Sequence, residues 1–101
     1  MKKRKVCITP EALRDIERLY DYIAYELLEP FTAQKYSEGV FDAIKELHRL
    51  GEALAVNQRE YLQRFYGPDV RTTNYKKVTI VFNIVGNVIL IRRVIAGGLV
   101  R

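Results

Sequence analysis

Two neighbouring segments near the C-terminus, residues 77–85 and 88–95, are rich in valine and isoleucine and are separated only by Gly86-Asn87. Gly-Asn is a tight-turn dipeptide, so this pattern predicts a β-hairpin. Successive side chains of the second strand point to opposite faces of the sheet. One face then carries Val88, Leu90, Arg92 and Val94, and the other carries Ile89, Ile91, Arg93 and Ile95. Both faces are mainly apolar, so we expect this strand to be central, with helices covering one side and partial shelter on the other.

Two adjacent arginines in the middle of this apolar strand need an anionic or aqueous environment. We expect Arg93 to lie on the open face of the sheet, available to an anionic partner. The stem of Arg92 would then run over the helices and leave its head group at the rim. Alternation alone does not choose between the two faces, so the reverse assignment stays open.

The first half of the chain predicts a short strand followed by two helices. Residues 5–9 form the strand, and Thr9 and Pro10 are suited to the N-cap and first position of a helix. The apolar stripe of that helix comprises Leu13, Ile16, Leu19, Tyr20, Ile23 and Leu27. Pro30 ends it and opens a second helix, whose stripe comprises Ala33, Tyr36, Val40, Ile44 and Leu47. Gly51 is placed as a C′ glycine, and the short connection predicts an antiparallel helical hairpin.

The segment between the second helix and the strands has a weaker pattern. Residues 57–60 have the spacing of a capping box, and a short helix over residues 61–66 would end at Gly67-Pro68. A further strand is expected over residues 70–75. The predicted fold class is therefore α+β: an N-terminal strand, an antiparallel helical hairpin packed on one face of the sheet, and a three-stranded antiparallel meander.

Length and composition indicate a single globular domain over residues 1–101, with about half of the residues apolar. The one cysteine, Cys7, excludes an internal disulfide and is expected to be a small buried hydrophobe in the first strand. The opening MKKRK is followed by only three apolar residues, too few for a secretory signal, and no apolar run is long enough to span a membrane. We expect a cytoplasmic protein with no membrane partner.

Charge divides the chain unevenly. The net charge is +5 overall, with +4 in residues 1–10, −5 in residues 11–52 and +6 in residues 53–101. A polyanion should therefore meet the second half and the N-terminal arm. The alternative is an ordinary mixed, solvated surface.

Four segments, in this order, resemble the RelE/ParE superfamily of bacterial toxins from type II toxin–antitoxin pairs: TPEALRDIERLYDYI, EPFTAQKY, VRTTNYKKVTIVFNI and VILIRRVIAGG. The resemblance runs from about Val6 to Gly98. It implies a small sheet with a helical hairpin on one face and a concave basic surface on the other, which the antitoxin wraps. RelE-like members cleave messenger RNA in the ribosomal A site, whereas ParE-like members poison DNA gyrase.

The resemblance also suggests site residues. Arg71 matches the arginine that opens the second strand in many members, and Arg93 matches the arginine of the I-x-R-V pattern in the last strand. Many members then carry an aromatic residue or histidine, glycines and an Arg-Asp pair. Here Ala96 takes the first of these positions and Leu99-Val100 takes the place of Arg-Asp. These departures weaken the case for catalysis.

Metal-independent RNA cleavage needs a base, an acid and cations around the scissile phosphate, and no cofactor or metal is expected. Arg71 and Arg93 are the catalytic candidates, although either could instead form an ion pair with an acid such as Asp69 or with an antitoxin carboxylate. The candidates for nucleic-acid or antitoxin binding are Arg59, Arg64, Lys76, Lys77, Arg92 and Arg101.

A proton-transfer group is harder to assign. The only histidine, His48, falls late in the second helix among acids and is expected to be a surface or flanking residue rather than a catalyst. The tyrosines nearest the basic segments are Tyr61, Tyr66 and Tyr75, which we expect to serve packing or base stacking rather than catalysis.

Three hypotheses follow for function. The favoured one is a ribosome-dependent messenger RNA endonuclease, the second a DNA gyrase inhibitor without nuclease activity, and the third an inactive relative that still binds an antitoxin. The expected partners are accordingly the ribosome and messenger RNA, or DNA gyrase. All three hypotheses share a cognate acidic antitoxin, with a segment that folds on binding to the basic strands.

Overall fold

A computed structural model describes residues 4–97. The chain runs through the following elements: β1 (Lys5–Ile8), α1 (Pro10–Asp21), a π-helical turn (Tyr22–Glu26), α2 (Pro30–Leu50), a 3₁₀ turn (Gly51–Ala53), α3 (Glu60–Tyr66), β2 (Arg71–Tyr75), β3 (Val78–Val85) and β4 (Val88–Ala96). The predicted α+β class is confirmed. Within this range no helix is both long and apolar enough to cross a bilayer.

The four strands form one sheet in the order β1-β4-β3-β2. Strands β2, β3 and β4 make the predicted antiparallel meander, with the turn between the last two at Gly86-Asn87. β1 pairs in parallel with β4, from Lys5 opposite Val88 to Ile8 opposite Ile91. β4 is therefore central over its first half, as its apolar pattern predicts; beyond Ile91 it pairs only with β3, because β1 ends opposite that residue.

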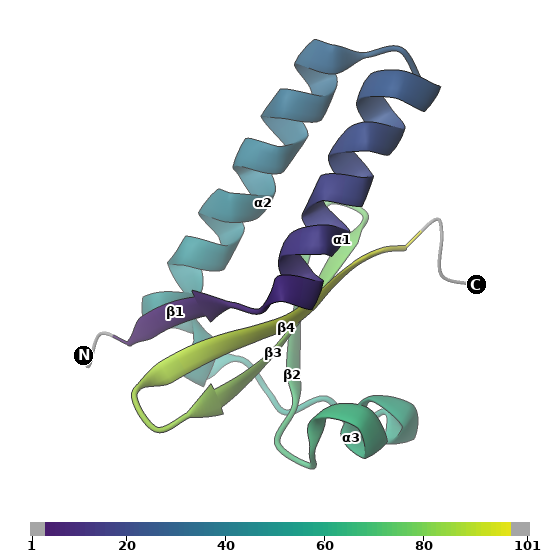
Figure 1. Ribbon diagram of the computed structural model, residues 1–101. Helices are drawn as coiled ribbons and strands as arrows, with labels where there is room; N and C mark the ends of the chain where they lie inside the picture. The colour runs from purple at the N-terminus through teal and green to yellow at the C-terminus, as the bar shows by residue number, and fades with distance from the viewer. Residues whose placement is uncertain (1–3, 98–101) are drawn as a thin grey trace.

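Helices α1 and α2 form an antiparallel hairpin over one face of the sheet, and α3 lies beyond the sheet, away from the hairpin (Figure 1). The main core lies between the hairpin and the sheet and contains Ala12, Ile16, Val40, Ile44, Leu47, Val78, Ile80, Phe82, Ile89, Ile91 and Val94. A smaller cluster joins Leu62 of α3 to Val70 and Val81. The sheet is thus covered on one face and only partly covered on the other.

Thr9 connects α1 to the sheet. Its Oγ1 accepts a hydrogen bond from the Ala12 amide at 3.2 Å, as an N-cap should, and donates to the Ile91 carbonyl at 2.8 Å. One side chain therefore satisfies a free amide of the helix and also fixes the start of α1 against β4.

Three sequence expectations about burial and conformation are wrong. Cys7 lies in β1 as expected but is exposed, because alternation along this edge strand turns Val6 and Ile8 toward the core instead. Leu13 and Leu27 are exposed, and the buried stripe of α1 passes through Ala12 and Ile16.

Gly51 caps α2 with φ −57°, which is not left-handed. A Cβ at this position would lie only 3.1 Å from Ile89 Cδ1. Close packing against β4, rather than a turn, is what this glycine permits.

The short helix α3 is confirmed, but its start differs from the predicted capping box. The N-cap is Arg59, whose side chain makes no capping bond. Asn57 Oδ1 accepts from the Arg59 amide at 2.9 Å, and Gln63 Nε2 donates to the Asn57 carbonyl at 3.0 Å. Asn57 therefore fixes the entry to α3 from two residues before the cap.

Candidate functional site

A β-bulge in β4 decides where the two central arginines point. Phe82 of β3 pairs with Ile91, whereas the preceding Val81 pairs with Arg93, so Arg92 is the extra residue. Because one inserted residue reverses the alternation, Ile89 and Ile91 are buried before the bulge and Val94 after it. The strict alternation assumed from the sequence is therefore wrong beyond Ile91.

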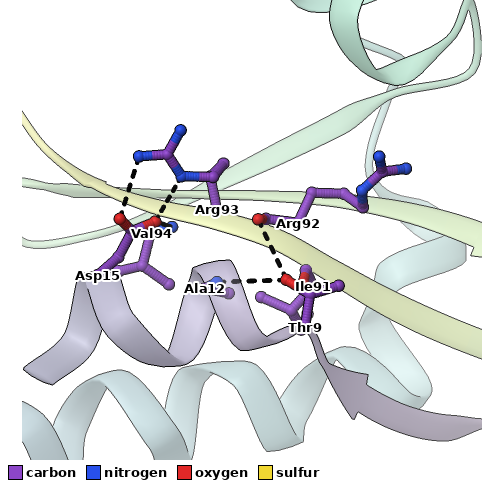
Figure 2. Close-up of polar contacts among 7 residues, drawn as sticks. All are labelled: Thr9, Ala12, Asp15, Ile91, Arg92, Arg93 and Val94. Atoms are coloured by element: carbon purple, nitrogen blue, oxygen red, sulfur yellow. Dashed lines mark hydrogen bonds and ion pairs between the residues drawn. The ribbon is translucent and has the colours of Figure 1, made fainter.

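Arg93 is held by α1. Its Nε and Nη2 donate to Oδ2 and Oδ1 of Asp15 at 2.7 and 3.0 Å, and the Val94 amide donates to Oδ2 at 2.9 Å. Figure 2 shows this carboxylate of α1 facing β4, with the Arg92 head group turned the other way. Asp15 is nearly buried, and it closes the edge of β4 where β1 no longer pairs with it.

These contacts fix the charge of Arg93. The hydrogen bonds that Arg93 donates to Asp15 raise the pKa of Arg93 above its ordinary value, with a smaller contribution from Tyr66, and partial burial opposes both. The guanidinium is therefore a permanent cation at the edge of β4, with two of its nitrogens already bonded to a carboxylate. The expectation of a free cation on the open face is not met.

Arg92 lies on the α3 side of the sheet, which corrects the expectation that its stem covers the helices. Its Nη1 donates to Asn83 Oδ1 at 3.2 Å, and its guanidinium carbon lies 5.0 Å from the centre of the Tyr66 ring. Asn83 is buried in β3 and donates to the Tyr66 carbonyl at 2.9 Å and to Asp69 at 3.3 Å. Arg92 is thus presented on the open face by a cation–π contact and a buried amide.

Next to this cluster, the open face carries a groove of about 310 Å³ between α3 and the sheet. It is lined by Asn57, Arg59, Tyr61, Leu62, Thr72, Asn74, Thr79, Val81, Ile95 and Gly97. Its floor is ordered by side-chain hydrogen bonds, from Asn57 to Thr72 at 2.9 Å and from Thr79 to Asn74 at 2.9 Å. Amide and hydroxyl groups with one arginine suit polar recognition of a peptide or phosphate group, and they supply no strong acid or base.

Arg71 has an internal role in this structure. Its Nη1 donates to the carbonyls of Gly51, Glu52 and Leu54, at 3.2, 2.9 and 3.0 Å. The guanidinium thus satisfies carbonyls of the turn that follows α2 and ties this turn to β2. Arg71 forms no ion pair with Asp69, the alternative that the sequence suggested.

The remaining predicted cations are distributed over separate surfaces. Lys76 and Lys77 form the turn between β2 and β3, with Lys76 Nζ 5.6 and 5.5 Å from the ring centres of Tyr36 and Tyr75. Arg59 and Arg64 are exposed at either end of α3, and Arg64 pairs with Glu60 at 3.2 Å. Arg101 lies outside the described residues. The structure brings Arg59 and Arg92 to the open face, whereas Lys76 lies over the Tyr36 ring of α2 and the Lys77 amide donates to the Tyr36 hydroxyl at 3.3 Å.

The titratable candidates for proton transfer lie elsewhere or are used in packing. His48 is on α2, with Nδ1 2.6 Å from the Lys45 carbonyl. Tyr75 packs edge-on against Tyr36, with its hydroxyl over Gly39 of α2. Tyr61 is half-exposed beside the groove, and Tyr66 lies under Arg92. Among residues 4–97, no cluster of His, Cys, Asp and Glu is arranged to hold a metal.

The sequence reasoning missed two residues that organise this region, Asp15 and Asn83. Asp15 stands at a buried position of α1, which the stripe of apolar residues did not include. Asn83 is the one amide in a strand otherwise built from Val, Ile, Phe and Thr. A polar residue in so apolar a strand is a usable signal, because a buried amide requires partners.

Comparisons with known proteins agree with the fold. The sequence model of the "ParE toxin of type II toxin-antitoxin system, parDE" matches residues 6–98. The structure of a chromosomal ParDE toxin–antitoxin system from P. aeruginosa superposes with a TM-score of 0.77 at 23% identity, covering 93% of this chain and 96% of that one. The RelBE2 toxin–antitoxin complex of Mycobacterium tuberculosis superposes with a TM-score of 0.60 at 18% identity, covering 93% of this chain and 98% of that one. No curated protein matches the sequence.

Proposed function

This chain belongs to the ParE toxin family of type II toxin–antitoxin systems, and from that membership we propose that it stops growth by binding DNA gyrase rather than by cutting messenger RNA. The RelE/ParE resemblance seen in the sequence is confirmed, and the chain is the toxin of such a pair. The choice of target is our proposal.

The observation that carries the proposal is the position of the two arginines first considered catalytic. Arg93 is bonded by two nitrogens to Asp15, and Arg71 donates to three carbonyls of residues 51–54. A nuclease needs cations free to bind the scissile phosphate and a titratable group beside them. Both guanidinium groups instead hold the fold together, which favours inhibition by protein binding.

The same geometry supports an acidic antitoxin as partner. Arg59 and Arg92 lie along the open face, and the groove beside α3 offers amides and hydroxyls for a peptide backbone. We propose that an acidic antitoxin segment folds across this face and pairs with these two arginines. The complex should weaken as salt concentration rises, because part of its energy is electrostatic.

The test is a supercoiling assay with purified DNA gyrase, run beside mapping of messenger RNA 5′ ends after induction of the protein. We expect the protein to inhibit supercoiling, the antitoxin to restore it, and no new RNA ends to appear. New ends inside translated messages that vanish with a translation inhibitor would overturn the proposal and establish the ribosome-dependent nuclease. Arg71→Lys and Arg93→Lys, which keep the charge, would then be the first variants to compare.

A further inference from the structure

The connection between α1 and α2 exposes an unusual number of large apolar side chains. We call Tyr22, Tyr25, Leu27, Leu28 and Phe31 the tip patch. Tyr25, Leu28 and Phe31 are 71%, 79% and 84% exposed, and the other two are more than two-fifths exposed. Figure 1 shows this end of the hairpin projecting away from the sheet. Exposed apolar groups gathered in this way are typical of an interaction site.

The tip patch is not needed to hold the hairpin together. Ile23, Ala24 and Ala33 are buried beneath it as a small core, with Leu19, Tyr20 and Tyr36 packed around them. Two backbone hydrogen bonds close the turn: the Leu27 amide donates to the Tyr22 carbonyl at 3.1 Å, and the Glu29 amide donates to the Ile23 carbonyl at 3.0 Å. The exposed side chains of the tip patch belong neither to this small core nor to these backbone hydrogen bonds.

The backbone conformation at the centre of the tip patch is unfavourable for the leucine that occupies it. Leu28 has φ +56°, a left-handed conformation that glycine or asparagine adopts at lower cost. A leucine here is strained and leaves its side chain almost fully in water. Since neither property helps the fold, the position suggests selection for contact with another molecule.

Charge around the tip indicates what kind of molecule this is. Residues 19–34 contain Asp21, Glu26 and Glu29 and no lysine or arginine, and all three acids are exposed. An acidic rim repels nucleic acid, anionic lipid and an acidic antitoxin segment. It would also repel the same tip of a second copy. It complements a protein surface with an apolar depression surrounded by lysine and arginine.

We propose that the tip patch docks on the target protein, and that the partner's contact surface is apolar with a basic rim. The toxin would then use two separate surfaces: the acidic, apolar tip for the target and the basic open face beside α3 for the antitoxin. The inference rests on the proposed function for the identity of the target, DNA gyrase, whose work on DNA requires basic surfaces.

The experiment compares the wild-type protein with a Leu28→Gly/Phe31→Gln double variant and a Val85→Thr control. Leu28→Gly suits the left-handed backbone, and Phe31 is almost fully exposed, so the variant should fold. Val85 is an exposed apolar residue at the end of β3, outside the tip. Binding to purified gyrase, binding to the antitoxin, growth arrest and thermal unfolding are measured for all three.

We expect the double variant to lose at least about tenfold in affinity for gyrase, and to lose growth arrest in parallel, because anchoring apolar residues dominate such contacts. Its antitoxin affinity should stay near that of the wild type, and its unfolding temperature should not fall below the wild-type value, because Leu28→Gly relieves a left-handed leucine. The control should match the wild type throughout. A Glu26→Lys variant should weaken gyrase binding and reduce its dependence on salt.

Unchanged gyrase inhibition and growth arrest in the double variant would overturn the tip inference. A parallel loss of antitoxin binding would also overturn it, because the two partners would then share the tip. Self-association that the double substitution abolishes would overturn it as well. If the wild-type protein does not inhibit gyrase, the proposed target is wrong, and growth arrest alone decides the role of the tip. A wild-type protein that neither inhibits gyrase nor arrests growth would contradict both proposals.

Discussion

Removing Arg93 is expected to destabilise the protein far more than removing an exposed arginine does. Arg93→Ala leaves the Asp15 carboxylate without its counter-ion, in a position where its side chain is only 7% exposed. Breaking a fully buried ion pair costs about 3–5 kcal/mol, because the remaining charge stays desolvated. The Arg93 side chain is 33% exposed, so water can reach part of the site. We therefore expect a loss of about 2–3 kcal/mol in the free energy of unfolding.

The matched control is Arg49→Ala. Arg49 pairs with Glu46 one turn away on α2, and both side chains are about half exposed. Surface pairs of this kind contribute about 0–1 kcal/mol, so the control should lie near the wild type. Urea unfolding of both variants, followed by circular dichroism, measures the difference. A double-mutant cycle that combines Arg93→Ala with Asp15→Asn should give an interaction energy of at least about 1 kcal/mol between the two side chains.

The pH dependence has a definite sign. Because the pKa of Arg93 is raised in the folded protein, its contribution is fully present below the pKa of an unfolded arginine and is lost only as pH rises through the raised value. The cost of Arg93→Ala should thus be the same at neutral and at mildly alkaline pH. If Arg93→Ala costs no more than Arg49→Ala, the carboxylate is not desolvated and the reasoning is refuted.

Three further substitutions test other parts of the structure. Leu28→Gly should raise the free energy of unfolding by about 0.5–1 kcal/mol by relieving a left-handed leucine, whereas an unchanged or lower value would argue against strain. Gly39→Ala should cost about 1–3 kcal/mol in urea unfolding, because the Tyr75 ring occupies the space of the new methyl group; a neutral result would show that the ring moves freely. Asn83→Ala should cost about 1–3 kcal/mol, since the buried amide satisfies Arg92 and the Tyr66 carbonyl, and calorimetry showing wild-type stability would contradict that role.

Short-range patterns in the sequence were sufficient to predict most of the fold. Thr9 and Pro10 set the start of α1, and Gly86-Asn87 set the turn between β3 and β4. The buried residues of α2 are those of its predicted stripe, apart from the partly buried Tyr36. These features depend on backbone geometry and periodicity over a few residues, so they can be read along the chain.

The site was predicted less well, because its geometry depends on contacts between distant residues. Arg71 reaches carbonyls about twenty positions earlier in the chain, and Lys76 lies among aromatic rings of α2 and β2. The exposure of Cys7 depends on which face of β1 turns toward the helical hairpin, and Val6 and Ile8 occupy that face. Residue type identified the cations in advance, but the surface that each one occupies depends on the packing of the elements.

The sequence by itself determined the element types, the meander, the helical hairpin and the resemblance to the RelE/ParE superfamily. Only the tertiary structure decided the roles of the two central arginines of β4. The bulge at Arg92 shifts the strand by one residue, and a one-residue shift exchanges the faces of every side chain that follows. Arg93 then meets Asp15, which is 78 positions away in the sequence. Local alternation contains no information about such an insertion, because the pairing with β3 and the carboxylate of α1 stabilise it only in the folded protein.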